Sequence, residues 1–275
     1  MKKFPSVILF LFVVIGSVCA ARVDTVSIQS QSMTGAIKCV VITPGSYNKE
    51  KTEFPVVYLL HGYGGNYSSW IKKAPHVAAL SDLYRVIIIC PDGGFDSWYW
   101  DSPIEKNSRY ETHIIREVIP FVDKNYRTVK NRRGRAISGL SMGGQGALYL
   151  AFKHQDLFGA CGSQSGGVDI RPFPNRWGMA AKIGKLADQP EVWEKQTVFN
   201  MVHLLIPGSL KIAIDCGLDD FFYSVNQSLH KKLDYYNIPH DYTIRPGKHN
   251  WEYWRNSVKY QLLFFYEYFQ ENKTK

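Results

Sequence analysis

Apolar runs and alternating segments divide the chain into predicted strands. Val56–Leu60 and Val86–Ile89 are unbroken apolar runs rich in β-branched residues, which is typical of strands covered on both faces. Val23–Gln31 and Ala36–Thr43 alternate apolar and polar residues, and they predict an antiparallel pair at the start of the fold. Further strands are predicted at Arg135–Ser138, Phe158–Ser163, Leu210–Cys216 and Tyr242–Arg245.

Helical patterns fall between most of these strands. The clearest begins at Ser108, where Ser108 and Glu111 form a capping-box pattern before apolar residues at helical spacing that reach Tyr126. Glu111 is therefore interpreted as a cap, and Pro120 is expected to kink the helix. Trp251–Gln270 predicts a last helix packed on the sheet. The alternation predicts an α/β fold with a mostly parallel central sheet and helices on both faces.

The first twenty residues have the pattern of a secretory signal peptide. Lys2 and Lys3 precede an apolar run, Val7–Val18, and a small-residue step ends at Ala20. The apolar run is shorter than the roughly 20 residues that a spanning helix needs, so we expect cleavage after Ala20 and a secreted or periplasmic protein without a membrane span. Lipidation of Cys19 is the alternative, which the bulk of Val18 disfavours.

Composition narrows the class of the remaining chain, residues 21–275. The full sequence has 45% hydrophobic and 21% charged residues, and residues 21–275 contain no repeat or low-complexity linker, so this segment is expected to be one globular domain. The net charge of +9 does not indicate nucleic-acid binding, because the longest basic run, Lys130–Arg135, is interrupted by Asn131 and Gly134. No CxxC pair or HExxH helix indicates a metal site, and no cofactor is expected. Four cysteines of this segment fall in or at the end of predicted strands and are expected to be buried free thiols: Cys39, Cys90, Cys161 and Cys216.

A G-x-S-x-G pentapeptide, Gly139–Gly143, is the first chemical motif. The pentapeptide alone is a weak signal, but here it follows the predicted strand Arg135–Ser138 and opens an apolar helix from Gln145 to Phe152. This is the setting of a nucleophile elbow, in which glycines flank a serine held in strained backbone geometry. Ser141 is therefore the candidate nucleophile.

A glycine-rich loop, His61–Gly65, follows the predicted strand Val56–Leu60. A tetrahedral intermediate needs two N–H donors, and such a loop can direct the Tyr63 amide at the oxygen that the Met142 amide reaches from the elbow. Tyr63 and Met142 are thus the candidate oxyanion hole.

A serine nucleophile needs a histidine base with an acid behind it, and in this type of sheet the chain order is serine, acid, histidine. His249 stands in a loop between a predicted strand and the last helix, whereas four other histidines lie in or beside regular elements and are more typical of surface or core positions: His154, His203, His230 and His240. The acid is expected after the preceding strand, where Asp219 and Asp220 are both available.

Four segments together resemble a known family: Leu59–Gly65, Gly139–Gly144, Cys216–Asp220 and Gly247–Trp251. They are similar to the Putative esterase family of α/β-hydrolases, which includes feruloyl and acetyl xylan esterases, S-formylglutathione hydrolase and the mycolyltransferases. The resemblance extends from about Val23 to Phe269 and implies an α/β-hydrolase fold. It implies a triad of Ser141, Asp220 and His249, and oxyanion amides at Tyr63 and Met142. Lys248 departs from the family pattern, where a second glycine is usual, but this removes no catalytic group.

The expected function is that of a secreted serine carboxylesterase acting on a small-molecule or oligosaccharide ester. The acyl group is expected to be acetyl or feruloyl, carried on carbohydrate. Three aromatic residues near the predicted site are candidates for substrate contact: Trp98, Trp100 and Trp251. A thioesterase of the S-formylglutathione hydrolase type, an acyltransferase and a non-catalytic carbohydrate-binding domain remain open as alternatives, and the sequence does not indicate the oligomeric state.

Overall fold

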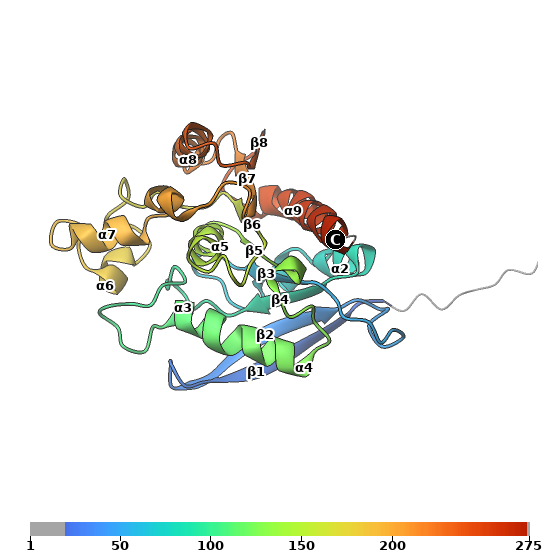
Figure 1. Ribbon diagram of the computed structural model, residues 1–275. Helices are drawn as coiled ribbons and strands as arrows, with labels where there is room; N and C mark the ends of the chain where they lie inside the picture. Colours follow the sequence, from blue (N-terminus) through green and yellow to red (C-terminus); the bar gives the residue numbers. More distant parts are fainter. Residues whose placement is uncertain (1–19, 274–275) are drawn as a thin grey trace, which may run out of the picture.

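One sheet organises the part of the chain that the computed structural model describes, residues 20–273. Its strands run in the order β1-β2-β4-β3-β5-β6-β7-β8 (Figure 1). β1 pairs with β2 and β2 with β4 in antiparallel fashion, and all later neighbours are parallel. The strands are β1 Arg22–Ser30, β2 Gly35–Thr43, β3 Val56–Leu60, β4 Ile87–Pro91, β5 Arg135–Gly139, β6 Ala160–Gln164, β7 Lys211–Gly217 and β8 Asp241–Arg245.

Every strand predicted from the hydrophobic pattern is confirmed, with bounds within two residues of those expected. The antiparallel opening and the mostly parallel sheet are confirmed as well. The predicted signal peptide and Cys19 lie outside the described residues, of which Ala20 is the first.

Helices cover both faces of the sheet. Side chains alternate between the two faces along each strand, so the apolar strands have side chains to bury on both faces. The α-helices are α1 Ser69–Lys73, α2 Val77–Tyr84, α3 Tyr110–Thr112, α4 Ile119–Asn125, α5 Met142–Lys153, α6 Met179–Ile183, α7 Pro190–Gln196, α8 Tyr223–Tyr235 and α9 Trp251–Lys273. Tyr58 and Leu60 of β3 belong to the core cluster that includes residues of α4, α5 and α8, whereas Val57 and Leu59 belong to the cluster that includes residues of α1, α2 and α9. A π-helix spans His113–Val118, and 3₁₀ helices span Arg132–Gly134 and Val198–Leu204.

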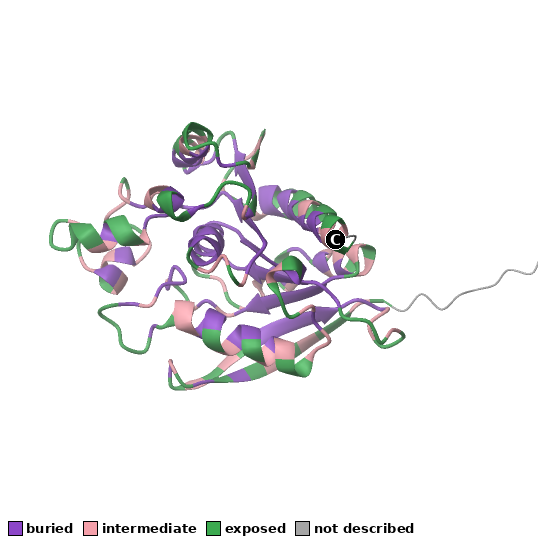
Figure 2. Cartoon of the chain, in the orientation of Figure 1, coloured by how far each residue is buried: buried purple, intermediate pink, exposed green. Residues whose placement is uncertain are grey.

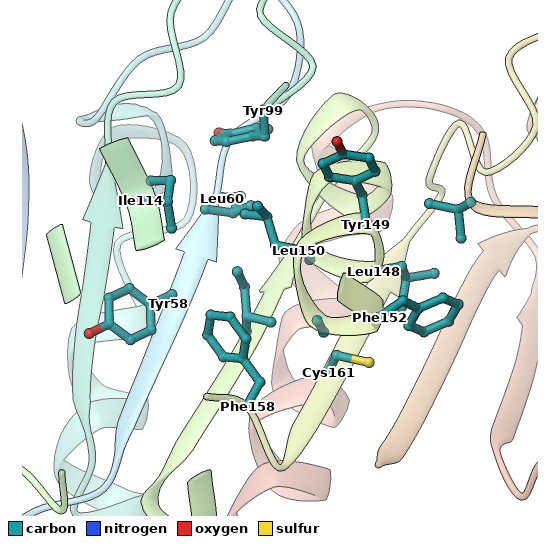
Figure 3. Close-up of a cluster of buried hydrophobic side chains, with 14 of the residues drawn as sticks. Tyr58, Leu60, Tyr99, Ile114, Leu148, Tyr149, Leu150, Phe152, Phe158 and Cys161 are labelled. Carbon is teal, nitrogen blue, oxygen red and sulfur yellow. The ribbon is translucent and has the colours of Figure 1, made fainter. Parts of the chain in front are cut away.

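The core on the α5 face is built largely from aromatic and branched side chains. Figure 3 shows Leu148 and Phe152 of α5 on one side of the helix, and Tyr58 and Phe158 in the same buried cluster on its other side. The rings of Tyr58 and Phe158 meet edge to face, with centroids 6.2 Å apart. The central strands are buried throughout, and the outward faces of the helices are exposed (Figure 2).

The prediction of buried free thiols is confirmed for four cysteines: Cys39, Cys90, Cys161 and Cys216. Within residues 20–273, no helix is both long and apolar enough to cross a bilayer.

The helical segment after Ser108 differs from its prediction. It begins at Tyr110 and is divided into α3, the π-helix His113–Val118 and α4, instead of forming one kinked α-helix. Pro120 lies in the first turn of α4 and lacks an N–H to donate to the preceding turn, which accounts for wider turns just before it.

Glu111 is not a helix cap. The N-cap residue of α3 is Arg109, whose side chain makes no capping hydrogen bond. Glu111 instead accepts hydrogen bonds from the Tyr149 hydroxyl at 2.8 Å and the Lys153 ammonium at 2.7 Å, and its other oxygen lies 2.9 Å from Nε2 of His154. These three donors come from the end of α5 and the residue after it. They are about 40 residues away in the chain, so the sequence around Ser108 could not predict them.

Candidate active site

The serine of the Gly139–Gly143 pentapeptide stands on a tight turn between β5 and α5. β5 ends at Gly139 and α5 begins at Met142, so the predicted strand-turn-helix setting is confirmed. The backbone of Ser141 has φ 55° and ψ −117°. Non-glycine residues adopt this conformation at a cost of about 1–3 kcal/mol, and strain of this kind concentrates at functional sites. The Ser141 amide donates to the Gln164 carbonyl at 2.9 Å, which ties the turn to β6.

Glycines flank the serine because backbone segments approach too closely for side chains. A Cβ atom at Gly139 would lie 2.4 Å from the Gly143 carbonyl oxygen. At Gly143 it would lie 2.6 Å from the carbonyl oxygens of Leu60 and His61. Both separations are shorter than real Cβ contacts, so the elbow packs against the loop after β3 only with glycine at these positions.

His249 joins Ser141 to Asp220 through hydrogen bonds. Its Nε2 lies 2.8 Å from the Ser141 Oγ, and its Nδ1 lies 2.8 Å from Oδ2 and 3.0 Å from Oδ1 of Asp220. An ionised carboxylate accepts only, so Nδ1 carries the proton and Nε2 accepts the serine hydroxyl. In this tautomer the imidazole is arranged to take a proton from Ser141.

The structure distinguishes the two adjacent aspartates. The Asp220 side chain is fully buried, and the Phe222 amide donates to its Oδ1 at 2.8 Å. Asp219 is exposed, and its amide donates to the Gly247 carbonyl at 2.9 Å, which joins the loops after β7 and β8. Asp220 is thus the aspartate that contacts His249, as the family resemblance implied.

The two predicted oxyanion donors, the Tyr63 and Met142 amides, belong to segments next to the cleft that holds Ser141. Met142 is the first residue of α5, where backbone N–H groups have no acceptor within the helix. Tyr63 lies in the loop after β3 and lines the same cleft as Ser141. Both candidate donors are main-chain N–H groups, whose positions are fixed by the backbone and not by side-chain rotamers.

His61 and Tyr99 hold the loop that carries Tyr63. The Gly93 amide donates to Nε2 of His61 at 2.7 Å, so the buried ring carries its proton on Nδ1, which donates to the Gly62 carbonyl at 2.9 Å. The Tyr99 hydroxyl donates to the His61 carbonyl at 3.0 Å. Burial raises the pKa of Tyr99 well above its ordinary value, which keeps this hydroxyl a donor.

A cleft of about 380 Å³ opens above Ser141 and His249. Five aromatic residues line it, together with the glycines of the loop after β3, Ser69, Lys73 and Leu140: Tyr63, Trp177, Phe221, Trp251 and Trp254. The Phe221 ring lies 4.1 Å from the imidazole of His249 and stacks on Trp177 at 5.5 Å between centroids. The cleft therefore offers flat apolar surface directly beside the serine and histidine.

Trp251 lines the cleft, but the prediction of substrate contact is corrected for Trp98 and Trp100. Their side chains are only 1% and 0% exposed, and neither lines the cleft. The two rings stack on each other at 5.6 Å within the core on the α5 face. Trp98 contacts the cleft residue Trp177, whose ring centroid lies 6.2 Å away and whose carbonyl accepts from the Trp98 indole N–H.

Sequence reasoning missed Phe221 and Trp177 as cleft residues. Phe221 directly follows the candidate acid, so its position next to Asp220 was a usable signal. Trp177 lies in the segment between β6 and α6, far from any motif. No local pattern could have placed Trp177 at the site.

The fold and the site together define a class of proteins. A mostly parallel sheet with a serine on the β5–α5 turn and an acid and a histidine after later strands is the arrangement of the α/β-hydrolases. A solved ferulic acid esterase structure superposes with a TM-score of 0.78 at 27% identity, covering 90% of this chain and 99% of that one.

The chain belongs to the Putative esterase family, whose model matches residues 30–265. An acetyl esterase of Caldicellulosiruptor saccharolyticus is 30% identical over 227 residues, which cover 74% of this chain and 79% of that protein. An esterase of Mycobacterium tuberculosis is 34% identical over 134 residues, or 48% of this chain. The matched region is 29% of that esterase, so this relative is much longer than the region shared with it.

Proposed function

We propose that the protein is a serine carboxylesterase in which Ser141 is the nucleophile, His249 the general base and acid, and Asp220 the residue that orients His249. One observation carries the proposal, namely the continuous hydrogen-bonded path from the Ser141 Oγ through the His249 ring to the Asp220 carboxylate. A serine hydroxyl is a weak nucleophile until a base removes its proton, and this path supplies that base in the required tautomer.

The reaction proceeds in two halves. The Ser141 Oγ forms a bond to the ester carbonyl carbon while its proton passes to Nε2 of His249, and the Tyr63 and Met142 amides stabilise the resulting oxyanion. The intermediate collapses by breaking the bond to the alcohol oxygen, which receives the proton from His249. Water then attacks the acyl-enzyme, gives its proton to His249 in the same way, and releases the acid and free Ser141.

The preferred acyl group is aromatic, of the feruloyl type, and its natural carrier is a carbohydrate. The aromatic walls of the cleft support this choice, because offset stacking on an aryl acyl group adds about 0.5–1.5 kcal/mol for each ring pair beyond the area buried. An acetyl group would leave much of this surface unused. The similarity to a ferulic acid esterase agrees with the same assignment.

The predicted export of the protein supports a carbohydrate as the carrier of the acyl group. Residues 1–20 have the composition of a signal peptide, and polymeric carbohydrate esters are met outside the cytoplasm. We propose that the mature enzyme acts there as a hydrolase.

A turnover panel on the purified protein tests the proposal. Methyl ferulate, an acetylated xylo-oligosaccharide and S-formylglutathione are compared by kcat/KM, with product analysis in the presence of added xylose to detect acyl transfer. We expect methyl ferulate to exceed the acetylated oligosaccharide, and both to exceed the thioester. A preference for S-formylglutathione would reject the carbohydrate assignment, and dominant transfer to xylose would replace hydrolysis with acyl transfer. No turnover of any substrate would favour a binding domain.

A further inference from the structure

Two histidines and an aspartate converge at the end of α8 that is remote from the active site. His230 and Asp234 are four residues apart on α8 and therefore share a helical face, and His240 lies just before β8. Nδ1 of His230 lies 2.8 Å from Nε2 of His240. The Asp234 carboxylate lies 3.4 Å from Nε2 of His230 and 3.9 Å from Nε2 of His240. Figure 1 shows α8 beside β8 at the edge of the fold.

The hydrogen bond from Nδ1 of His240 leaves the Nε2 atom of its ring with a lone pair. Its side chain is 2% exposed, and its Nδ1 donates to the Ile238 carbonyl at 2.8 Å, so the lone pair is on Nε2 and is directed at His230 and Asp234. A backbone carbonyl that accepts from the second ring nitrogen is the usual support of a metal-bound histidine, because it fixes both the tautomer and the ring orientation.

The ring of His230 is held in place as well. It stacks on Tyr242 with 4.2 Å between centroids and 17° between the ring planes. Side-chain ordering before binding lowers the entropic cost that a metal ion would otherwise have to offset. Two of the three donors are thus preorganised, and the exposed Asp234 can adjust to complete the set.

The spacing of the donor atoms suits a small tetrahedral cation. Bonds of about 2.0–2.1 Å from zinc to nitrogen or oxygen place neighbouring ligand atoms about 3.3 Å apart in a tetrahedron. With one ligand atom taken from each residue, the donor atoms of His230, Asp234 and His240 all lie within 4.8 Å of one another, so small side-chain movements bring them to that spacing. Three donors with one carboxylate leave a fourth position for water.

We propose that His230, Asp234 and His240 form a zinc site that joins α8 to the start of β8. Imidazole ligands favour zinc and its transition-metal neighbours, whereas calcium and magnesium require mostly oxygen ligands. β8 pairs only with β7 among the described strands, so the site would hold an edge strand in place. Asp220 precedes α8 and His249 follows β8, and the zinc ion therefore supports the segment that carries both residues without taking part in the reaction.

Zinc titration of the full chain, prepared without a histidine tag, tests the site. Calorimetry is expected to give one zinc ion per chain, and Co²⁺ in its place is expected to show the visible absorption of tetrahedral coordination. Asp234→Asn and His230→Ala should each weaken zinc binding at least tenfold. The melting temperature should rise with zinc for the wild type and not for these variants, since a ligand stabilises only the state that binds it.

His203→Ala is the matched control, because His203 is also near the surface but lies in the 3₁₀ helix Val198–Leu204, away from this cluster. It should bind zinc as the wild type does. The Asp234 side chain is 60% exposed, so Asp234→Asn should fold even if a variant at the buried His240 does not. Absence of one-to-one binding, equal binding by Asp234→Asn, or an equal loss in His203→Ala would each overturn the proposal.

Discussion

The hydroxyl of Ser141 lies 2.8 Å from Nε2 of His249, although the two residues are 108 positions apart in the chain. Ser141 is fixed by a strained turn after β5, and His249 by the loop between β8 and α9. Two strands, β6 and β7, lie between the two anchoring strands in the sheet. The contact therefore depends on the whole carboxyl edge of the sheet, and catalytic loss and unfolding have to be measured separately in any variant of this site.

Replacing Ser141 with alanine removes the proposed nucleophile and keeps a Cβ atom at the strained turn. We expect kcat to fall about 10³-fold or more, because the oxyanion donors and binding alone retain only a residual rate. Steady-state kinetics with methyl ferulate measures the loss. An organophosphate should label the wild type at Ser141 and leave the variant unlabelled, and peptide mass spectrometry showing label at Ser163 or Ser165 would contradict the assignment.

Asparagine at position 220 tests the orienting role of Asp220. The amide would favour the wrong tautomer of His249, so we expect Asp220→Asn to lower kcat by up to about 10⁴-fold with little change in KM. Asp219→Asn is the matched control, because Asp219 is exposed and one residue away, and its kcat should stay within about tenfold of the wild type. Melting temperatures of both variants separate catalysis from stability. A reversed order of the two kcat values would assign the acid to Asp219.

Phe221 is expected to select aromatic acyl groups. It is 49% exposed, and its ring extends the stack of Trp177 beside His249. Because one aromatic pair adds about 0.5–1.5 kcal/mol, Phe221→Ala should raise KM for methyl ferulate about 2- to 13-fold and change KM for an acetyl ester less. Tyr235→Ala, an exposed aromatic residue at the end of α8, is the control. Equal losses on the two esters would show that Phe221 acts on the site in general and not on the acyl group.

Glu111 is expected to stabilise the fold in a pH-dependent way. Burial acts to raise the pKa of its carboxyl, but hydrogen bonds from His154, Lys153 and Tyr149 outweigh this and lower the pKa from 4.5 to about 2. Glu111→Gln should lower the free energy of unfolding at pH 7 by about 1.5–3 kcal/mol, the usual contribution of hydrogen bonds to a charged group. Denaturant titration measures the difference, with Glu53→Gln at an exposed position as the control.

The sign of this pH dependence follows from the lowered pKa of Glu111. The unfolded chain binds the proton more tightly than the folded one, so the stabilisation is complete above the ordinary value of 4.5 and is lost as pH falls towards about 2. The gap in unfolding free energy between wild type and Glu111→Gln should therefore close between about pH 5 and pH 2. A gap that widened on acidification would contradict the assigned interaction.

Short-range patterns were sufficient for the strands and for the serine turn. Val56–Leu60 is a strand because a continuous β-branched and apolar run can be buried on both faces, and this depends on neighbouring residues alone. The turn at Ser141 is likewise recognisable from Gly139 and Gly143, since the close approach of the backbone excludes side chains there. The prediction that Glu111 is a helix cap was wrong, because the donors that bind its carboxylate come from α5 and not from neighbouring residues.

The sequence by itself determined the α/β alternation, the elbow serine and the loop histidine, because each is specified by residues close together in the chain. The residues alone left Asp219 and Asp220 both available, and the tertiary structure places only Asp220 against His249, since the loops after β7 and β8 must dock before either carboxylate meets the ring. Tertiary structure also decided which aromatic residues line the cleft beside Ser141. Trp98 is buried and contacts Trp177, a residue from the β6–α6 segment, and burial of this kind is a property of packing between distant segments that no local periodicity encodes.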